Sequence, residues 1–226
     1  MRLLYLVTSA TVLLALANPA SATVVDPLDD FLSTYTGPLN DDVDILSGDV
    51  AFDGTSYFLT STMNGAIGTT TGSIFVWGIN RGSGAPRLTF GSPSVGAGVL
   101  FDAVVVMFPD GTLRIVTIPP AGAPTFNVIA GGTTIAGNSL SATVPLSLLD
   151  SMGLAPEDYM FNLWSRTRVN PLADGTNAEI ADFLSSSTQA RAVPEPATWL
   201  MMLLGFGLTG TAFRRSRRAS LLKAVA

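Results

Sequence analysis

The chain has 226 residues, of which 47% are hydrophobic and 13% charged, and it contains no cysteine and no histidine. These absences exclude disulfides, thiolate nucleophiles, histidine-based catalytic triads and the commonest metal ligand. The formal net charge of −5, from 12 basic and 17 acidic residues, argues against a nucleic-acid partner.

The N-terminus is predicted to be a cleavable signal peptide over residues 1–22. Arg2 supplies a positive charge, residues 3–16 are uncharged and rich in leucine, and Pro19 ends any helix. The small residues Ala20 and Ala22 form the pattern that signal peptidase accepts, so we expect cleavage after Ala22 and export of the rest. An uncleaved anchor is the alternative, but the apolar stretch is short for a membrane span.

Residues 23–183 are predicted to form one mainly β domain. Short segments rich in β-branched and aromatic residues alternate with Gly, Pro, Asn, Asp and Ser. The expected strands are residues 43–52, 56–63, 73–79, 99–108, 112–118, 125–130, 139–144 and 159–167. Many short strands without intervening long helices predict an antiparallel β-sandwich of the jelly-roll type.

Turns and short helices are expected between these strands. Pro109-Asp110-Gly111 should close a hairpin, because Pro fixes φ and Gly accepts positive φ. One short helix is expected to start at Pro145 and end near Gly153, and a second is expected over residues 26–35.

The exported region is strongly acidic. Residues 23–192 hold sixteen acidic side chains, six arginines and no lysine, and hence a net charge of −10. Such a surface is soluble and self-repelling, and it does not adhere unaided to anionic lipid or nucleic acid.

Three groups of residues are candidate sites. Asp41, Asp42 and Asp44 precede a strand and are a candidate Ca²⁺ site, although a solvated acidic loop is the alternative. Trp77 and Trp164 lie beside polar residues and are candidate glycan contacts, against the alternative that both indoles belong to the core. Arg166 and Arg168 point to one face of a strand and would clasp an acidic group or pair with an aspartate.

Nothing in the sequence supplies a base to activate a serine nucleophile, since there is no His and the only Lys is Lys223. Paired carboxylates keep glycoside hydrolysis open as an alternative. We therefore expect a non-enzymatic protein with a structural or weak binding role, with a carbohydrate-binding module as the first alternative and a glycoside hydrolase as the second.

The C-terminus is predicted to contain a flexible stalk over residues 184–192, a transmembrane helix over residues 197–213 and a cytoplasmic tail over residues 219–226. The predicted helix carries no charge and is followed at once by four arginines, Arg214, Arg215, Arg217 and Arg218. Basic residues beside a span are retained on the cytoplasmic side. The precursor is therefore expected to sit in the inner membrane with its N-terminal side out and its C-terminus in.

Residues 193–218 resemble the PEP-CTERM protein-sorting signal. Val193, Pro194, Glu195 and Pro196 come first, then the apolar span, then the arginine cluster. The resemblance implies recognition by an exosortase, a membrane-embedded transpeptidase of Gram-negative bacteria. It also implies removal of the tail near the Pro-Glu-Pro segment and delivery to the cell surface or the exopolysaccharide matrix.

The exported domain is similar in layout to DOMON-like domains and family-9 carbohydrate-binding modules. The similarity covers the FDAVVVMFPDG hairpin, the GNSLSATVPLSLL segment and the YMFNLWSR strand. It implies a β-sandwich fold. Haem-binding DOMON domains use His and Met ligands, and the lack of His in this chain argues against haem.

Overall fold

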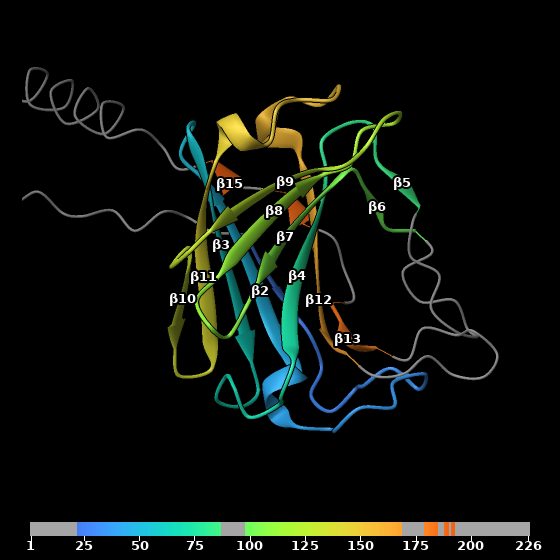
Figure 1. The fold of residues 1–226 in the computed structure, drawn as a ribbon, viewed down its shortest axis with the longest axis vertical. Helices are drawn as coiled ribbons and strands as arrows, with labels where there is room; N and C mark the ends of the chain where they lie inside the picture. The colour runs from blue at the N-terminus through green and yellow to red at the C-terminus, as the bar shows by residue number, and fades with distance from the viewer. Residues whose placement is uncertain (1–21, 87–97, 169–178, 185–187, 190, 193–226) are drawn as a thin grey trace, which may run out of the picture.

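The computed structural model describes residues 22–86, 98–168, 179–184, 188–189 and 191–192, and these residues form a sandwich of two β-sheets that are antiparallel except where β15 pairs with β2 (Figure 1). The six-stranded sheet contains, in spatial order, β1 (Ala22–Val25), β2 (Ile45–Phe52), β3 (Ser56–Met63), β11 (Ser139–Pro145) and β10 (Thr133–Ala136), with β15 (Arg191–Ala192) beside β2. The seven-stranded sheet contains β13 (Ile180–Phe183), β12 (Met160–Thr167), β4 (Ser73–Asn80), β7 (Ala103–Met107), β8 (Leu113–Thr117) and β9 (Thr125–Ile129), with β14 (Thr188–Gln189) beside β12.

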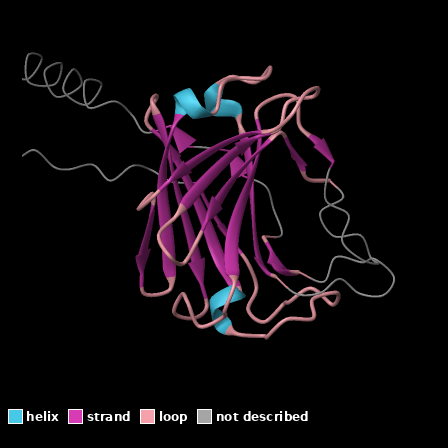
Figure 2. Cartoon of the chain, in the orientation of Figure 1, coloured by secondary structure: helices cyan, strands magenta, loops and turns pink. Residues whose placement is uncertain are grey.

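Smaller elements lie at the ends and side of the sandwich (Figure 2). The 3₁₀ helix η1 (Asp41–Val43) lies at one end, and η2 (Leu146–Leu148) and η3 (Pro156–Asp158) lie at the other. The short strands β5 (Ala85–Pro86) and β6 (Leu100–Phe101) pair with each other as a separate ribbon. No helix among the described residues is long and apolar enough to cross a membrane, and the predicted span at residues 197–213 lies outside them.

The predicted fold class is confirmed: the described chain is mainly β, in antiparallel sheets. Two local predictions are wrong. Residues 26–35 contain turns and no helix. Part of the predicted flexible stalk is strand, because β14 pairs with β12 and β15 pairs with β2.

The expected hairpin turn at Pro109-Asp110-Gly111 is confirmed. Gly111 has a φ of +88°. The backbone N–H of Phe108 donates to the carbonyl of Thr112 at 3.0 Å, and the Asp110 carboxylate accepts the N–H of Thr112 at 2.8 Å. Local turn chemistry therefore fixes the register of β7 against β8.

The main core fills the space between the inner faces of the two sheets. Strand alternation directs large aromatic residues inward, and the largest fully buried side chains include Trp77, Tyr57, Tyr159, Phe75 and Phe161. Trp77 meets Phe161 edge to face with ring centroids 6.5 Å apart. Aromatic residues therefore fill the interior between the sheets, and the residues on the two outer faces determine the chemistry of the surface.

The two outer faces differ in chemistry. A second apolar cluster lies on the outer side of the seven-stranded sheet and includes Val76, Val106, Trp164 and Phe183. The outer side of β3 and β11 instead carries Thr60, Thr62, Ser139 and Ser141, which alternate with buried residues. The six-stranded sheet therefore presents hydroxyl groups to solvent.

Both ends of the described chain lie on one edge of β2. Ala22 of β1 lies opposite Val50, and Arg191 of β15 lies opposite Ala51. Because β3 occupies the other edge of β2 at these positions, β1 and β15 follow one another along the same edge. The first and last described residues of the domain are thus neighbours in space.

Candidate functional site

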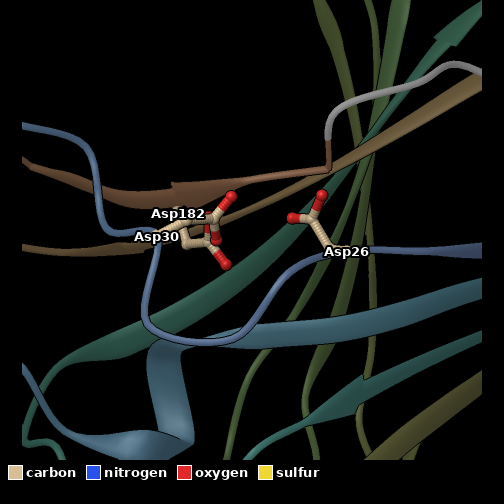
Figure 3. Close-up of side chains that lie close together, drawn as sticks. All are labelled: Asp26, Asp30 and Asp182. Atoms are coloured by element: carbon tan, nitrogen blue, oxygen red, sulfur yellow. The ribbon is translucent and has the colours of Figure 1, made fainter.

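A cluster of three carboxylates lies where the segment after β1 meets β13 (Figure 3). Carboxylate oxygens of Asp26, Asp30 and Asp182 all lie within 4.8 Å of one another. Asp182 is 1% exposed, and its two oxygens accept the backbone N–H groups of Ile45 and Phe183, each at 2.6 Å. The cluster therefore ties the N-terminal segment, β2 and β13 together.

Burial dominates the electrostatics of this cluster. Loss of solvation, with a smaller contribution from the nearby charges of Asp26 and Asp30, raises the pKa of Asp182 to about 7 despite the lowering effect of its two backbone donors. Burial also raises the pKa of Asp30. Like charges gathered this closely favour a shared proton or a bound cation over full ionisation.

The predicted Ca²⁺ residues do not gather in this way. The Asp42 carboxylate accepts the backbone N–H of Thr70 at 2.7 Å, and the Asp44 carboxylate accepts the backbone N–H of Asp29 at 3.2 Å. Asp41 is exposed at the start of η1. The prediction that these three aspartates share one site is wrong, because two of them are buried against different protein donors.

The two tryptophans offer no open ring face to a sugar. Trp77 is fully buried and its indole N–H donates to the Ser61 hydroxyl at 2.9 Å. Trp164 is 3% exposed and stacks with Phe183, with centroids 5.9 Å apart. Its ring also lies over Gly78, where a Cβ would come within 2.7 Å of it. The prediction of glycan contacts at Trp77 and Trp164 is corrected: both indoles are packed inside apolar clusters.

Trp164→Ala is expected to lower the free energy of unfolding by about 3–5 kcal/mol, because it empties a large packed site. Phe126→Ala is the matched control, since Phe126 is 64% exposed on β9 and should change stability little. Urea unfolding followed by far-UV circular dichroism measures both. Equal stability of Trp164→Ala and the wild type would contradict the buried position.

The two arginines on β12 and just beyond it behave differently. Arg166 forms an ion pair with Glu179, a glutamate and not the aspartate that the alternative named. Arg168 is exposed. Burial and the charge of Arg168 lower the pKa of Arg166. Only Arg168 remains directed to solvent as a candidate contact.

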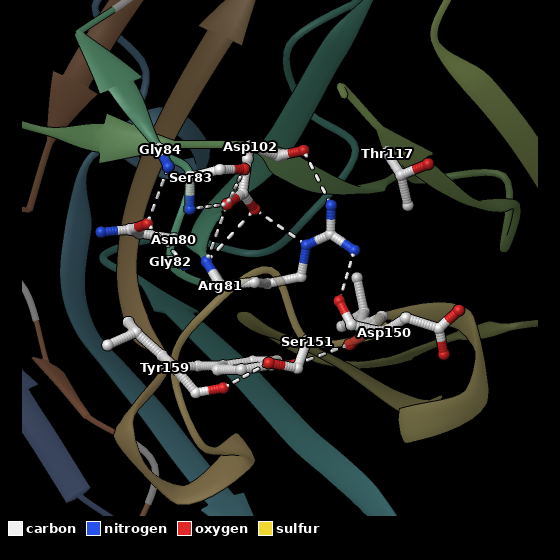
Figure 4. A network of polar contacts seen from close by, with 12 residues as sticks. Asn80, Arg81, Gly82, Ser83, Gly84, Asp102, Thr117, Asp150, Ser151 and Tyr159 are labelled. Carbon is white, nitrogen blue, oxygen red and sulfur yellow. Dashed lines mark hydrogen bonds and ion pairs between the residues drawn. The ribbon is translucent and has the colours of Figure 1, made fainter. Parts of the chain in front are cut away.

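A buried polar network, which the sequence did not reveal, lies at the end of the sandwich near η2 (Figure 4). The Arg81 side chain is 3% exposed and its Nε donates to the Asp102 carboxylate at 2.8 Å. Arg81 also donates to the carbonyl of Asp150 at 2.9 Å, and Asp102 accepts the backbone N–H of Ser83 at 3.0 Å. The network joins three loops, so its role is to hold this end of the fold.

The sorting residues Val193, Pro194, Glu195 and Pro196 and the four arginines after the apolar span lie outside the described residues, as do Ala20 and the rest of the signal peptide before Ala22. The family model of the PEP-CTERM protein-sorting motif matches residues 192–218. The resemblance of residues 193–218 to this motif is thereby confirmed. No curated protein and no solved structure gives a significant match to the chain. The similarity to DOMON-like domains and family-9 modules stays a prediction.

Proposed function

From the premise that this chain carries a PEP-CTERM sorting motif, and is therefore exported and processed at the membrane through exosortase, we propose that it is a non-enzymatic protein of the cell surface or exopolysaccharide matrix. The match at residues 192–218 is the observation that carries the proposal. The acidic, lysine-free exported region supports it, because such a domain stays soluble and separate from anionic lipid once released.

The positions of the two chain ends support a precursor held at both ends by one membrane. β1 begins at Ala22, β15 ends at Ala192, and both lie on the same edge of β2. A domain whose ends are neighbours can stay folded while the signal peptide and the span at residues 197–213 occupy the inner membrane together. Signal peptidase cleavage after Ala22 leaves the rest of β1 paired with β2.

The alternative of a glycoside hydrolase gains no support from the carboxylate cluster. Glycosidases place two carboxylates roughly 5–9 Å apart on either side of a sugar. Asp182 is 1% exposed and its oxygens are engaged by backbone donors. A sugar therefore has no access to the most perturbed carboxylate of the cluster.

Replacing Pro194, Glu195 and Pro196 together by alanine is expected to leave the tail attached and the protein in the membrane fraction. The wild type should lose both residues 1–22 and its C-terminal tail, because Ala20 and Ala22 match the pattern that signal peptidase accepts and the Pro-Glu-Pro segment lies within the sorting motif. Cell fractionation with intact-mass analysis in a host that encodes an exosortase measures both events. The control is Phe126→Ala in the exported domain, because Phe126 is 64% exposed and belongs to neither processing segment.

A wild-type chain found with residues 197–226 intact at the cell surface would contradict exosortase processing. A processed chain retained in the periplasm would contradict the surface or matrix destination while leaving the processing intact.

A further inference from the structure

A groove is hollowed into the outer face of the six-stranded sheet, away from the carboxylate cluster. It has a volume of about 420 Å³ and is lined by β3, β11, β10 and the Gly131–Gly132 turn. This volume falls within the roughly 300–1,000 Å³ typical of small-ligand sites. The chain crosses from the seven-stranded to the six-stranded sheet at that turn, between β9 and β10, so the crossing forms one wall of the groove.

Hydroxyl groups line this groove. Thr60, Ser141 and Thr134 are cross-strand neighbours in one row, and Thr143 lies in the next row. Within the described part of the chain, none of these four hydroxyls has a protein hydrogen-bond partner. Thr62 and Ser139, one row further on and outside the groove, satisfy each other at 3.0 Å. The hydroxyls of the groove are therefore free to bond a ligand, whereas their neighbours are not.

An aromatic ring lies beside these hydroxyls. Phe58 is directly opposite Thr143, and it points outward because its neighbours Tyr57 and Leu59 are both buried. Phe58 is half-buried and lines the groove. Strand spacing of about 4.8 Å and a repeat of about 6.7 Å along each strand place the ring and the hydroxyls at intervals comparable to a sugar ring.

The negative charge around the groove favours neutral sugars over anionic ones. No charged side chain belongs to its lining as the described residues form it. Asp49 lies next to Thr60 in the same cross-strand row, and the exported region has a net charge of −10 from its sixteen acidic and six basic residues. An anionic polysaccharide would be repelled here, and a neutral one would not.

We propose that this groove binds a segment of neutral polysaccharide, with a sugar ring stacked on Phe58 and its hydroxyl groups bonded by Thr60, Ser141 and Thr143. The inference rests on the proposed matrix function and names the partner class. A weakly apolar ring with unpaired hydroxyls around it suits the mixed C–H and O–H surface of a sugar better than the apolar face of a protein partner.

The test uses the full chain in detergent and affinity electrophoresis through gels containing a neutral glucan, a neutral mannan or polygalacturonic acid. We expect retardation by a neutral polysaccharide and none by the acidic one. Phe58→Ala should weaken that retardation at least about ten-fold, the scale of one lost aromatic contact. Phe126→Ala, which removes an exposed ring outside the groove, should leave it unchanged.

Two further variants keep the result interpretable. Phe58→Leu retains apolar volume and folding while removing the ring, and Ser141→Ala removes one free hydroxyl. Both should weaken retardation while the unfolding transition stays near the wild type. Equal mobility of all variants in every neutral gel, or retardation by polygalacturonic acid alone, would overturn the proposal.

A dimer that Phe58→Ala dissociates in sedimentation would also overturn the proposal, by assigning the face to a second copy of the chain. The detergent assay does not depend on sorting. A failure of binding with correct processing therefore counts against the groove alone, and a failure of processing with intact binding counts against the proposed function alone.

Discussion

Arg81→Met is expected to lower the free energy of unfolding by about 3–5 kcal/mol, because it leaves a buried carboxylate without its cation. Arg81 and Asp102 are 3% and 0% exposed, and their side chains meet at 2.8 Å. The substitution keeps the apolar stem of Arg81 and removes only the guanidinium. Its donors to the carbonyls of Asp102 and Asp150 disappear as well.

Urea unfolding at pH 7 measures this effect, and Arg114→Met is the matched control. Arg114 is only partly buried and its guanidinium lies 5.0 Å from the centre of the Phe108 ring. Loss of such a contact should cost at most about 1 kcal/mol. If the two methionine variants were equally stable, the network would contribute no more than a surface contact and its role in holding η2 and β4 together would be refuted.

Acidification from pH 8 to pH 4 is expected to stabilise the protein through Asp182, in contrast to the usual effect on paired carboxylates. Its pKa is raised from 3.8 to about 7 in the folded state. A group with a raised pKa holds its proton more tightly when folded, so its contribution is complete below about pH 3.8 and is lost as the pH rises through about 7. A shift of this size corresponds to a contribution of order 4 kcal/mol.

Asp182→Asn isolates this contribution. The amide does not titrate and keeps one acceptor for the N–H of Ile45 or Phe183, so the stability of the variant should vary less between pH 8 and pH 4 than that of the wild type. The control is Asp110→Asn. The Thr112 N–H lowers the pKa of exposed Asp110, whose contribution is therefore lost as the pH falls.

Denaturant unfolding at several pH values would contradict the assignment if wild type and Asp182→Asn followed parallel curves.

The same experiment with millimolar CaCl₂ examines the expected cation. Stabilisation at pH 8 that disappears in Asp182→Asn would place Ca²⁺ at Asp26, Asp30 and Asp182. Stabilisation that survives it would exclude Asp26, Asp30 and Asp182 as the Ca²⁺ site.

Strands and turns that depend on neighbours in the sequence were predictable. β3 has the bounds expected for it, Ser56–Met63, and the turn at Gly111 forms as Pro109 and Asp110 indicate. Period-two alternation and positive φ at glycine are local properties, so the sequence carries them directly. The sorting motif was equally readable, because it is a linear signal.

Contacts between distant segments were not predictable. Asp182 joins Asp26 across more than 150 residues, and Arg81 meets Asp102 only because β4 and β7 pair in one register. The alternating pattern around Trp164 indicates that its side chain lies on one face of β12, but it does not show that Phe101 and Phe183 cover that face. Side-chain partners of this kind depend on strand order, which a one-dimensional pattern does not contain.

Residue types and local periodicity alone specify an exported β protein with a C-terminal sorting signal, since export signals act as linear segments and strand formation follows short-range pattern. Folding in three dimensions assigns the roles of individual side chains: it buries Trp77, separates Asp42 from Asp44, and gathers Phe58, Thr60 and Ser141 around a groove. The physical reason is that burial and hydrogen-bond satisfaction depend on pairing between strands far apart in the chain. The free energy of each side chain therefore depends on which neighbours the fold places beside it.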